Sequence, residues 1–161
     1  LLGKGYKQIA HFAGPKDLDI CRKRRDGYLD ALKQANICVR NELVRYGGMH
    51  EDDGYASMSA LLNEALVPDA IFAVNDPVVI GAFQKIKEAG LNIPRDVALV
   101  GFSNNRITSL VDPPITTVNQ PSFEMGKVAA EVLIDAISND RSDDQPKTIV
   151  LDTELIIRDS T

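Results

Sequence analysis

Arg24 is the residue whose position in this sequence most strongly indicates a binding role. It falls in a segment of helical period, in the middle of an apolar stripe made by Ile20, Tyr28, Ala31, Leu32 and Ala35. A charged side chain on an inward helix face needs a partner, and the planar guanidinium donates forked pairs of hydrogen bonds to ligand oxygens. The position is equally compatible with a structural ion pair to a nearby aspartate, so both roles stay open.

Three further candidates lie at the end of an apolar run that continues into a helix. Asn75 offers a donor and an acceptor that suit the vicinal hydroxyls of a sugar or nucleoside, or it satisfies backbone groups of its own loop. Asp76 precedes Pro77, which predicts that Asp76 caps the following helix. Phe72 is either a core residue or an aromatic face for an apolar part of a ligand.

Catalytic and metal-binding arrangements are poorly supported. His11 lies inside a predicted strand and His50 in a loop, and neither belongs to a familiar nucleophile motif. Cys21 is expected to be an inert helical cysteine. The acidic cluster from 51 to 53 lacks calcium or zinc spacing, and no glycine-rich nucleotide-binding motif is present. The sequence therefore predicts a binding protein without cofactor or metal, rather than an enzyme.

The composition and charge of the chain limit the kinds of molecule that it is expected to bind. The chain has 161 residues, 44% hydrophobic and 25% charged, with a net charge of -5 and a pI near 5.0. This acidic balance opposes direct contact with nucleic acid. Two cysteines without metal spacing, no membrane-spanning run and no signal-peptide pattern indicate a reducing, cytoplasmic setting. The opening "LLGKGY" is typical of a helix end, so we expect the chain to begin inside a larger protein.

Short apolar runs alternate with helical segments, which predicts a doubly wound parallel sheet in a three-layer α/β/α fold. Strands are expected at 8–13, 42–46, 70–74, 97–102, 115–118 and 148–157, the last at or near a sheet edge. Helices are expected at 19–35, 53–66, 77–89 and 122–137, and the polar stretch 138–147 is expected to be an exposed loop. In such folds, ligands bind beyond the carboxyl ends of the strands.

Successive motifs then resemble one family along nearly the whole chain. They are "GYKQIAHFAGP", "RxxGYxxAL", "PDAIFAVND", "GAFQKIKEAGLNIPRDVALVGFSN", "DPPITTVNQP", "EMGKVAAEVL" and "TELIIRDST". In this combination and order they resemble the effector-binding core of LacI/GalR-type transcription regulators. The resemblance implies a periplasmic-binding-protein-like core of two subdomains, a small-molecule effector in the cleft between them, a homodimer, and operator DNA bound by a separate N-terminal domain absent here.

The resemblance also implies domain boundaries. Residues 6–114 and 147–161 correspond to the C-terminal subdomain. Residues 115–140 correspond to a crossover strand and helix of the N-terminal subdomain, most of which this chain lacks. The wide apolar face of that helix then needs partners from elsewhere, which leads us to expect self-association.

The motifs that match the family also indicate candidate ligand-binding residues in this sequence. Arg24 matches the effector-contacting arginine, Phe72 and Asn75 match cleft positions, and Met49 and Gln120 match them less securely. Ser103 stands where many relatives have an acidic residue that binds ligand hydroxyls, so a charged acceptor is missing. The resemblance implies sensing of a sugar or related metabolite to control operator binding. A periplasmic-type sugar-binding protein of a transport system is the alternative, and a protein co-regulator as partner stays open.

Overall fold

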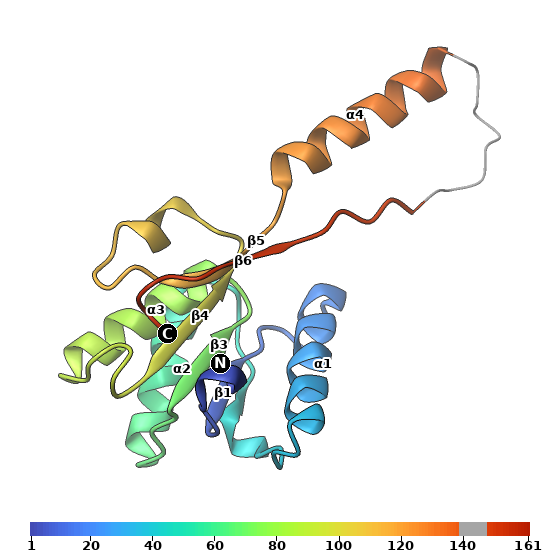
Figure 1. Cartoon of the computed structure of the whole chain (residues 1–161). Coiled ribbons are helices and arrows are strands. Elements are labelled where there is room, and N and C mark those ends of the chain that lie inside the picture. The colour runs from blue at the N-terminus through green and yellow to red at the C-terminus, as the bar shows by residue number, and fades with distance from the viewer. Residues whose placement is uncertain (139–147) are drawn as a thin grey trace.

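The computed structural model describes residues 1–138 and 148–161, in which strands and helices alternate (Figure 1). In chain order the main elements are β1 (Ile9–Phe12), α1 (Asp19–Gln34), β2 (Val44–Arg45), α2 (Glu51–Asn63), β3 (Ala70–Ala73), α3 (Asp76–Glu88), β4 (Ala98–Phe102), β5 (Thr116–Asn119), α4 (Ser122–Ser138) and β6 (Glu154–Ile156). Short 3-10 helices are η1 (Leu2–Lys4), η2 (Asn41–Leu43) and η3 (Arg106–Ser109). Within the described part of the chain, no helix combines the length and hydrophobicity needed to cross a bilayer.

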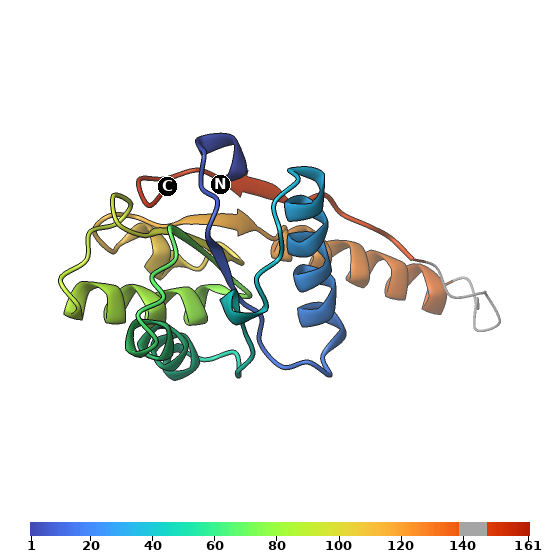
Figure 2. The same ribbon diagram turned by 90° about the horizontal axis from the view of Figure 1, so that it is seen from below.

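The strands form one six-stranded sheet in the order β2-β1-β3-β4-β5-β6. Neighbouring strands are parallel from β2 to β5, and β6 pairs antiparallel with β5 at the edge. Helices lie on both faces of the sheet, as the two views together show (Figure 2). The predicted doubly wound fold and the edge position of the last strand are both confirmed.

Successive side chains along the central strands point to opposite faces of the sheet, which divides the core into two layers. Ala10, Phe12 and Ile71 pack with α2 and α3 in the larger cluster. Ile9 and Ala70 face the other way and pack with α1. Because both faces are covered, nearly every residue of β1, β3 and β4 is buried.

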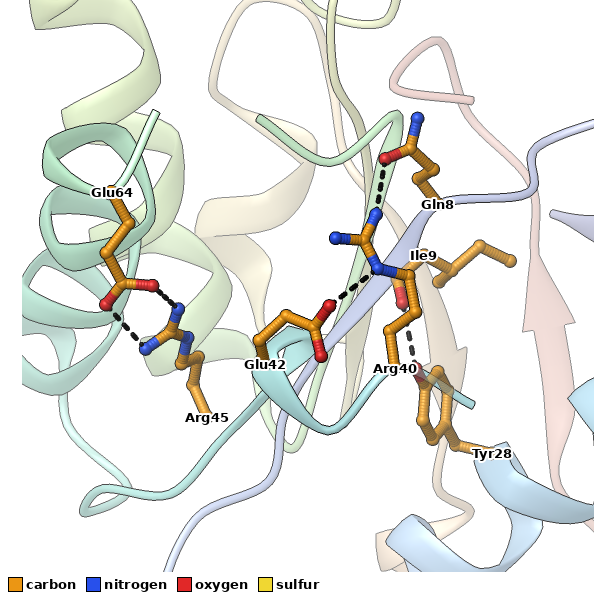
Figure 3. A network of polar contacts seen from close by, with 7 residues as sticks. All are labelled: Gln8, Ile9, Tyr28, Arg40, Glu42, Arg45 and Glu64. Atoms are coloured by element: carbon orange, nitrogen blue, oxygen red, sulfur yellow. Dashed lines mark hydrogen bonds and ion pairs between the residues drawn. The ribbon is translucent and has the colours of Figure 1, made fainter. Parts of the chain in front are cut away.

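Side-chain hydrogen bonds and ion pairs fasten α1, α2 and the loop before η2 to this sheet (Figure 3). The Tyr28 hydroxyl on α1 donates to the Ile9 carbonyl at 2.8 Å, inside the apolar layer. Arg45 on β2 forms an ion pair with Glu64, the residue after α2. Arg40 bonds both Glu42 and Gln8 at the amino end of β1. The Tyr28 bond fixes how α1 lies on the sheet, because a buried hydroxyl needs its partner.

Several element boundaries differ from the prediction. β2 covers only Val44–Arg45, because Asn41–Leu43 form a 3-10 turn. α2 starts at Glu51, two residues early, because the Asp53 carboxylate accepts a hydrogen bond from the backbone N–H of His50. The final strand is limited to Glu154–Ile156 instead of 148–157. The expected loop from 138 to 147 lies almost entirely outside the described residues.

β5 was expected to belong to the N-terminal subdomain, together with the rest of residues 115–140, but it pairs with β4. Thr116, Thr117 and Val118 pair in parallel register with β4, and the two threonines are buried. The strand is therefore part of this sheet, and the chain leaves it only at Gln120–Pro121. Beyond that point α4 projects away from the other layers together with the segment that leads into β6 (Figures 1 and 2). No residue of α4 is buried, and Phe123 is 80% exposed.

His11 is an unusual core residue. It is fully buried in β1 and stacks between the rings of Tyr28 and Phe72 at centroid distances of 5.0 and 4.9 Å. Its Nδ1 lies 2.8 Å from the Phe72 carbonyl oxygen, whereas Nε2 has no hydrogen-bond partner. Burial lowers the pKa of His11 to about 4, against 6.5 for an ordinary histidine.

The pH dependence of stability is expected to report this burial. The folded state binds fewer protons than the unfolded state between pH 6.5 and 4, so stability should fall as the pH decreases through this window, by roughly 3 kcal/mol in total. His11→Phe should remove most of this dependence while it keeps the ring stack, whereas His50→Phe should leave it intact. Urea unfolding at a series of pH values measures this. An unchanged slope in His11→Phe would show that other groups cause it.

The contact between α2 and α3 depends on two glycines. A Cβ at Gly81 would lie 1.8 Å from the Glu51 carbonyl oxygen, and one at Gly54 would lie 1.9 Å from that of Val78. The added Cβ would meet backbone atoms at both points, so no side-chain rotation relieves the clash.

Gly81→Ala should therefore lower the free energy of unfolding by about 2 kcal/mol or more. Gly27→Ala on α1, where nothing lies within 4 Å, should instead raise it by up to about 1 kcal/mol. Equal effects of the two substitutions in chemical denaturation would refute this account.

Candidate functional site

A groove of about 890 Å³ lies between α1 and the sheet, which we call the α1 groove. Its floor is one face of the central strands, which presents Phe72 near the end of β3 and Phe102 at the end of β4. Ile20, Tyr28 and Leu32 of α1 form one wall. The other wall is formed by Leu1 and Leu2 at the start of η1, with Leu155 of β6 and Ile157 just after it. The lining is largely apolar. Its polar residues include Lys4, Thr116 and Thr161 toward the amino end of β5, and Arg24 and Gln120 toward the carboxyl ends of the strands.

Arg24 lies at that end of the groove. Its guanidinium is centred 3.7 Å from the centroid of the Phe102 ring, and Nη1 donates a 2.6 Å hydrogen bond to the Val74 carbonyl. Burial lowers the pKa of Arg24, and the nearby Cys21 and Asp76 act against that decrease. Among the described residues no carboxylate forms an ion pair with it. The structural alternative for Arg24, a buried ion pair with aspartate, is therefore not what this structure contains.

Phe72 and Gln120 line the groove beside Arg24. Phe72 is partly exposed, and its ring stacks on His11. Gln120 follows β5, and its Oε1 accepts a 3.0 Å hydrogen bond from the Ser103 hydroxyl. The structure thus gathers three of the six predicted ligand residues at one end of the groove and connects a fourth, Ser103, through Gln120.

Asn75 and Met49 lie elsewhere. The Asn75 amide donates to the Met49 carbonyl at 2.9 Å and accepts from the backbone N–H of Val78 at 2.9 Å. The nitrogen and the oxygen of this amide both bond backbone groups, which is the structural role that the sequence left open for Asn75. The Met49 side chain packs against the α2–α3 layer, with its sulfur 4.0 Å from Cys21 Sγ.

The assignment of the helix cap to Asp76 was wrong. Asn75 caps α3, and Asp76 is the first residue inside the helix. The Asp76 carboxylate is fully buried, and it accepts a 2.8 Å bond from the Thr117 hydroxyl and a 2.6 Å bond from the backbone N–H of Asn105. Asp76 therefore ties the start of α3 to β5 and to the loop after β4.

That loop has an unusual backbone. Ser103 and Asn104 have φ values of 124° and 53°, in the region that residues other than glycine rarely adopt. Side chains hold this conformation from two sides. The Thr117 hydroxyl accepts from the backbone N–H of Asn104 at 3.2 Å, and Arg158 Nη2 donates to the Asn104 side-chain oxygen at 2.7 Å. The strained loop that presents Ser103 is thus fixed by a network of polar contacts.

Sequence reasoning missed Phe102 and Arg158, and it assigned Asp76 only to a helix cap. Phe102 could have been found, because it shares a face with Val100 in an alternating strand and precedes Ser103. The roles of Asp76 and Arg158 had no local signal, since their partners lie 29 to 54 residues away. Within the described residues, no group of three potential metal ligands occurs.

The buried Asp76 carboxylate is expected to contribute strongly to stability. Asp76→Asn keeps the volume but replaces a charged acceptor with one oxygen and an amide donor, which then faces the donors of Thr117 and Asn105. The free energy of unfolding should fall by about 2–3 kcal/mol, against less than about 0.5 kcal/mol for Asp30→Asn on the exposed face of α1. Chemical denaturation measures both variants. A near-neutral Asp76→Asn would show that a neutral amide satisfies the donors of Thr117 and Asn105 as well as the carboxylate does.

Comparison with known proteins agrees with this architecture. The family model described as "Periplasmic binding protein-like domain" matches residues 1–161. The regulator CelR of Thermobifida fusca is 36% identical over 160 residues, covering 99% of this chain and 46% of that protein. The repressor CytR of Escherichia coli (strain K12) is 34% identical over 161 residues, covering 100% of this chain and 47% of that protein. The chain thus spans about half the length of these curated relatives.

Solved structures agree with the sequence comparison. The structure titled "transcriptional regulator CelR-cellobiose complex" superposes with a TM-score of 0.92 at 36% identity, covering all of this chain and 49% of that one. The named relatives are transcriptional regulators, not enzymes. A regulatory protein of the LacI family from Chloroflexus aggregans is also similar, with a TM-score of 0.89 at 34% identity, covering 99% of this chain and 57% of that one. Because the family model matches from the first residue to the last, the chain belongs to the periplasmic binding protein-like domain family.

Proposed function

We propose that this chain is the ligand-sensing domain of a LacI-type transcription regulator and that it binds a sugar or related small metabolite at the Arg24 end of the α1 groove. The observation that carries the proposal is Arg24 itself. It is a partly buried cation at the carboxyl end of a parallel sheet, and it has no ion-pair partner among the described residues. Burying a charge without a partner is costly in a purely structural residue but useful in a binding site.

The surrounding groups suit a polyhydroxylated ligand. Gln120 and Ser103 provide amide and hydroxyl groups, and Phe72 provides an apolar ring face of the kind that packs against sugar rings. The CelR structure, which contains cellobiose by its title, makes a sugar the first ligand to test. A sugar-binding protein of a transport system shares this architecture, but the relatives favour the regulator.

The exposed surface around α4 indicates where the remainder of such a regulator packs. Met125, Val128 and Val132 on α4 face a second hollow whose opposite side is formed by Ile149 and Leu151. Leu133, Ile134 and Ile137 are also more than 60% exposed. Isolated soluble domains rarely expose so much contiguous apolar surface. We infer that α4 packs against a second subdomain of a longer, cytoplasmic, dimeric protein, and that DNA contacts come from outside this acidic chain.

Ligand titration tests the role of Arg24. In NMR titrations of the isotope-labelled chain with cellobiose, Arg24→Ala should weaken binding by about 10- to 100-fold, the effect of losing a charged hydrogen-bond donor worth about 1.5–3 kcal/mol. Arg22→Ala is the control, because Arg22 is exposed and pairs with Asp19. Stability without ligand should change by less than about 1.5 kcal/mol. A large loss of stability with unchanged affinity would assign Arg24 a structural role.

A further inference from the structure

Arg158 lies just after β6, and its half-buried guanidinium contacts the loop after β4, the turn η3 and the segment before β5. Nη2 donates to the Asn104 side-chain oxygen at 2.7 Å, and Nη1 donates to the Thr108 hydroxyl at 3.0 Å and to the Ile115 carbonyl at 2.7 Å. All three acceptors are neutral, and within the described residues no carboxylate forms an ion pair with Arg158. The cation is therefore stabilised by charge-assisted hydrogen bonds, which are stronger than neutral ones.

The bond to Asn104 fixes the direction of a short chain of hydrogen bonds. Because arginine has donors and no acceptor, the Asn104 amide must turn its oxygen toward Arg158 and its nitrogen away. That nitrogen donates at 3.1 Å to the side-chain oxygen of Asn119, the last residue of β5. Asn104 is thus held from two sides, by the segment after β6 and by the end of β5.

Ser103 depends on this arrangement. Its φ of 124° and the 53° of Asn104 lie in the region that residues other than glycine rarely adopt, so the loop keeps this conformation only while its neighbours hold it. In this conformation the Ser103 N–H donates to the Val118 carbonyl at 2.8 Å, and the Ser103 hydroxyl donates to Gln120 Oε1 at 3.0 Å. Gln120 lines the α1 groove. A continuous path of contacts therefore leads from Arg158 to a polar group of the candidate site.

We propose that Arg158 is a positioning residue of the ligand site, which holds Asn104 and thereby keeps the Ser103 hydroxyl on Gln120. This inference rests on the proposed function, because it takes Gln120 as part of the ligand site. Arg158 acts from outside the lining of the groove. Without it the groups of the site are unchanged in chemistry, but the loop samples other backbone conformations and ligand binding has to order it again.

Hydrogen exchange measured by NMR tests the positioning role without any ligand. Arg158→Lys keeps the charge and loses the fork of donors, so the Ser103 amide should exchange at least about tenfold faster as its backbone hydrogen bond opens more often. The Val74 amide, which bonds the Phe12 carbonyl of β1, should keep its rate. Arg106→Lys is the matched control, because Arg106 is an exposed arginine of η3, and it should change neither rate.

A double-mutant cycle tests the route through Asn104. Asn104→Gly removes the amide that Arg158 bonds, and glycine adopts a positive φ without steric cost, so the loop stays ordered. In that background Arg158→Lys should change the exchange rate of the Ser103 amide by less than about threefold. A tenfold effect in both backgrounds would show that Arg158 acts through Thr108 or Ile115 instead, and it would overturn the inference.

Titration with cellobiose measures the consequence for binding. Arg158→Lys should weaken the affinity of the chain for cellobiose by about 5- to 30-fold, which corresponds to ordering about one residue on binding. Arg106→Lys should bind like the unmodified chain. Unchanged affinity in Arg158→Lys would show that the ligand does not depend on the Ser103 loop, and the inference would be wrong.

The exchange rates separate this inference from the proposed function. Equal acceleration at Ser103 and Val74 would show that Arg158 only stabilises the fold, and an unchanged rate at Ser103 would show that the loop does not need Arg158; each result contradicts the inference. If the unmodified chain binds no cellobiose at high millimolar concentration, cellobiose sensing in the α1 groove is contradicted together with the effect on binding. The exchange rates then still decide whether Arg158 holds the loop.

Discussion

The candidate site depends on one buried carboxylate. Asp76 is fully buried and bonds Thr117 of β5 and the backbone of Asn105, so the first turn of α3, the loop after β4 and the neighbouring strand form one unit. Charged hydrogen bonds in a low-dielectric interior are strong, and leaving a buried partner unsatisfied is costly. The backbone of Ser103 and Asn104, in a region that L-residues rarely occupy, persists because this network surrounds it.

Arg158 extends the unit toward the end of the chain. Its guanidinium donates to Asn104, to the Thr108 hydroxyl and to the Ile115 carbonyl, at 2.7, 3.0 and 2.7 Å. Ser160 adds bonds to the backbone of Leu99 and Thr116. The loop that holds Ser103 is therefore connected to the segment after β5 through Gln120 and to the end of the chain after β6 through Arg158.

The two faces of the sheet differ in how completely helices cover them. On one face, α2 and α3 approach each other at Gly54 and Gly81 and cover a continuous apolar cluster, which supplies most of the packing. On the other face, α1 covers only part of the strands and leaves a groove that reaches Arg24. A closely packed layer on one side thus supports the candidate site on the other, an arrangement that suits a binding surface.

Much of this protein could be predicted from local pattern. Apolar runs and helical periods determined the order of the main elements, because both faces of the sheet are covered and each face imposes its own period. The place of Arg24 in an apolar stripe marks it as unusual from the order of residues alone. Element ends were less predictable, since the start of α2 depends on the Asp53–His50 contact. The roles of Asp76 and Arg158, the occupied amide of Asn75 and the separation of Met49 from the groove were decided by the tertiary structure alone. Their partners lie far away in the sequence, and only folding brings those hydrogen-bonding groups within reach.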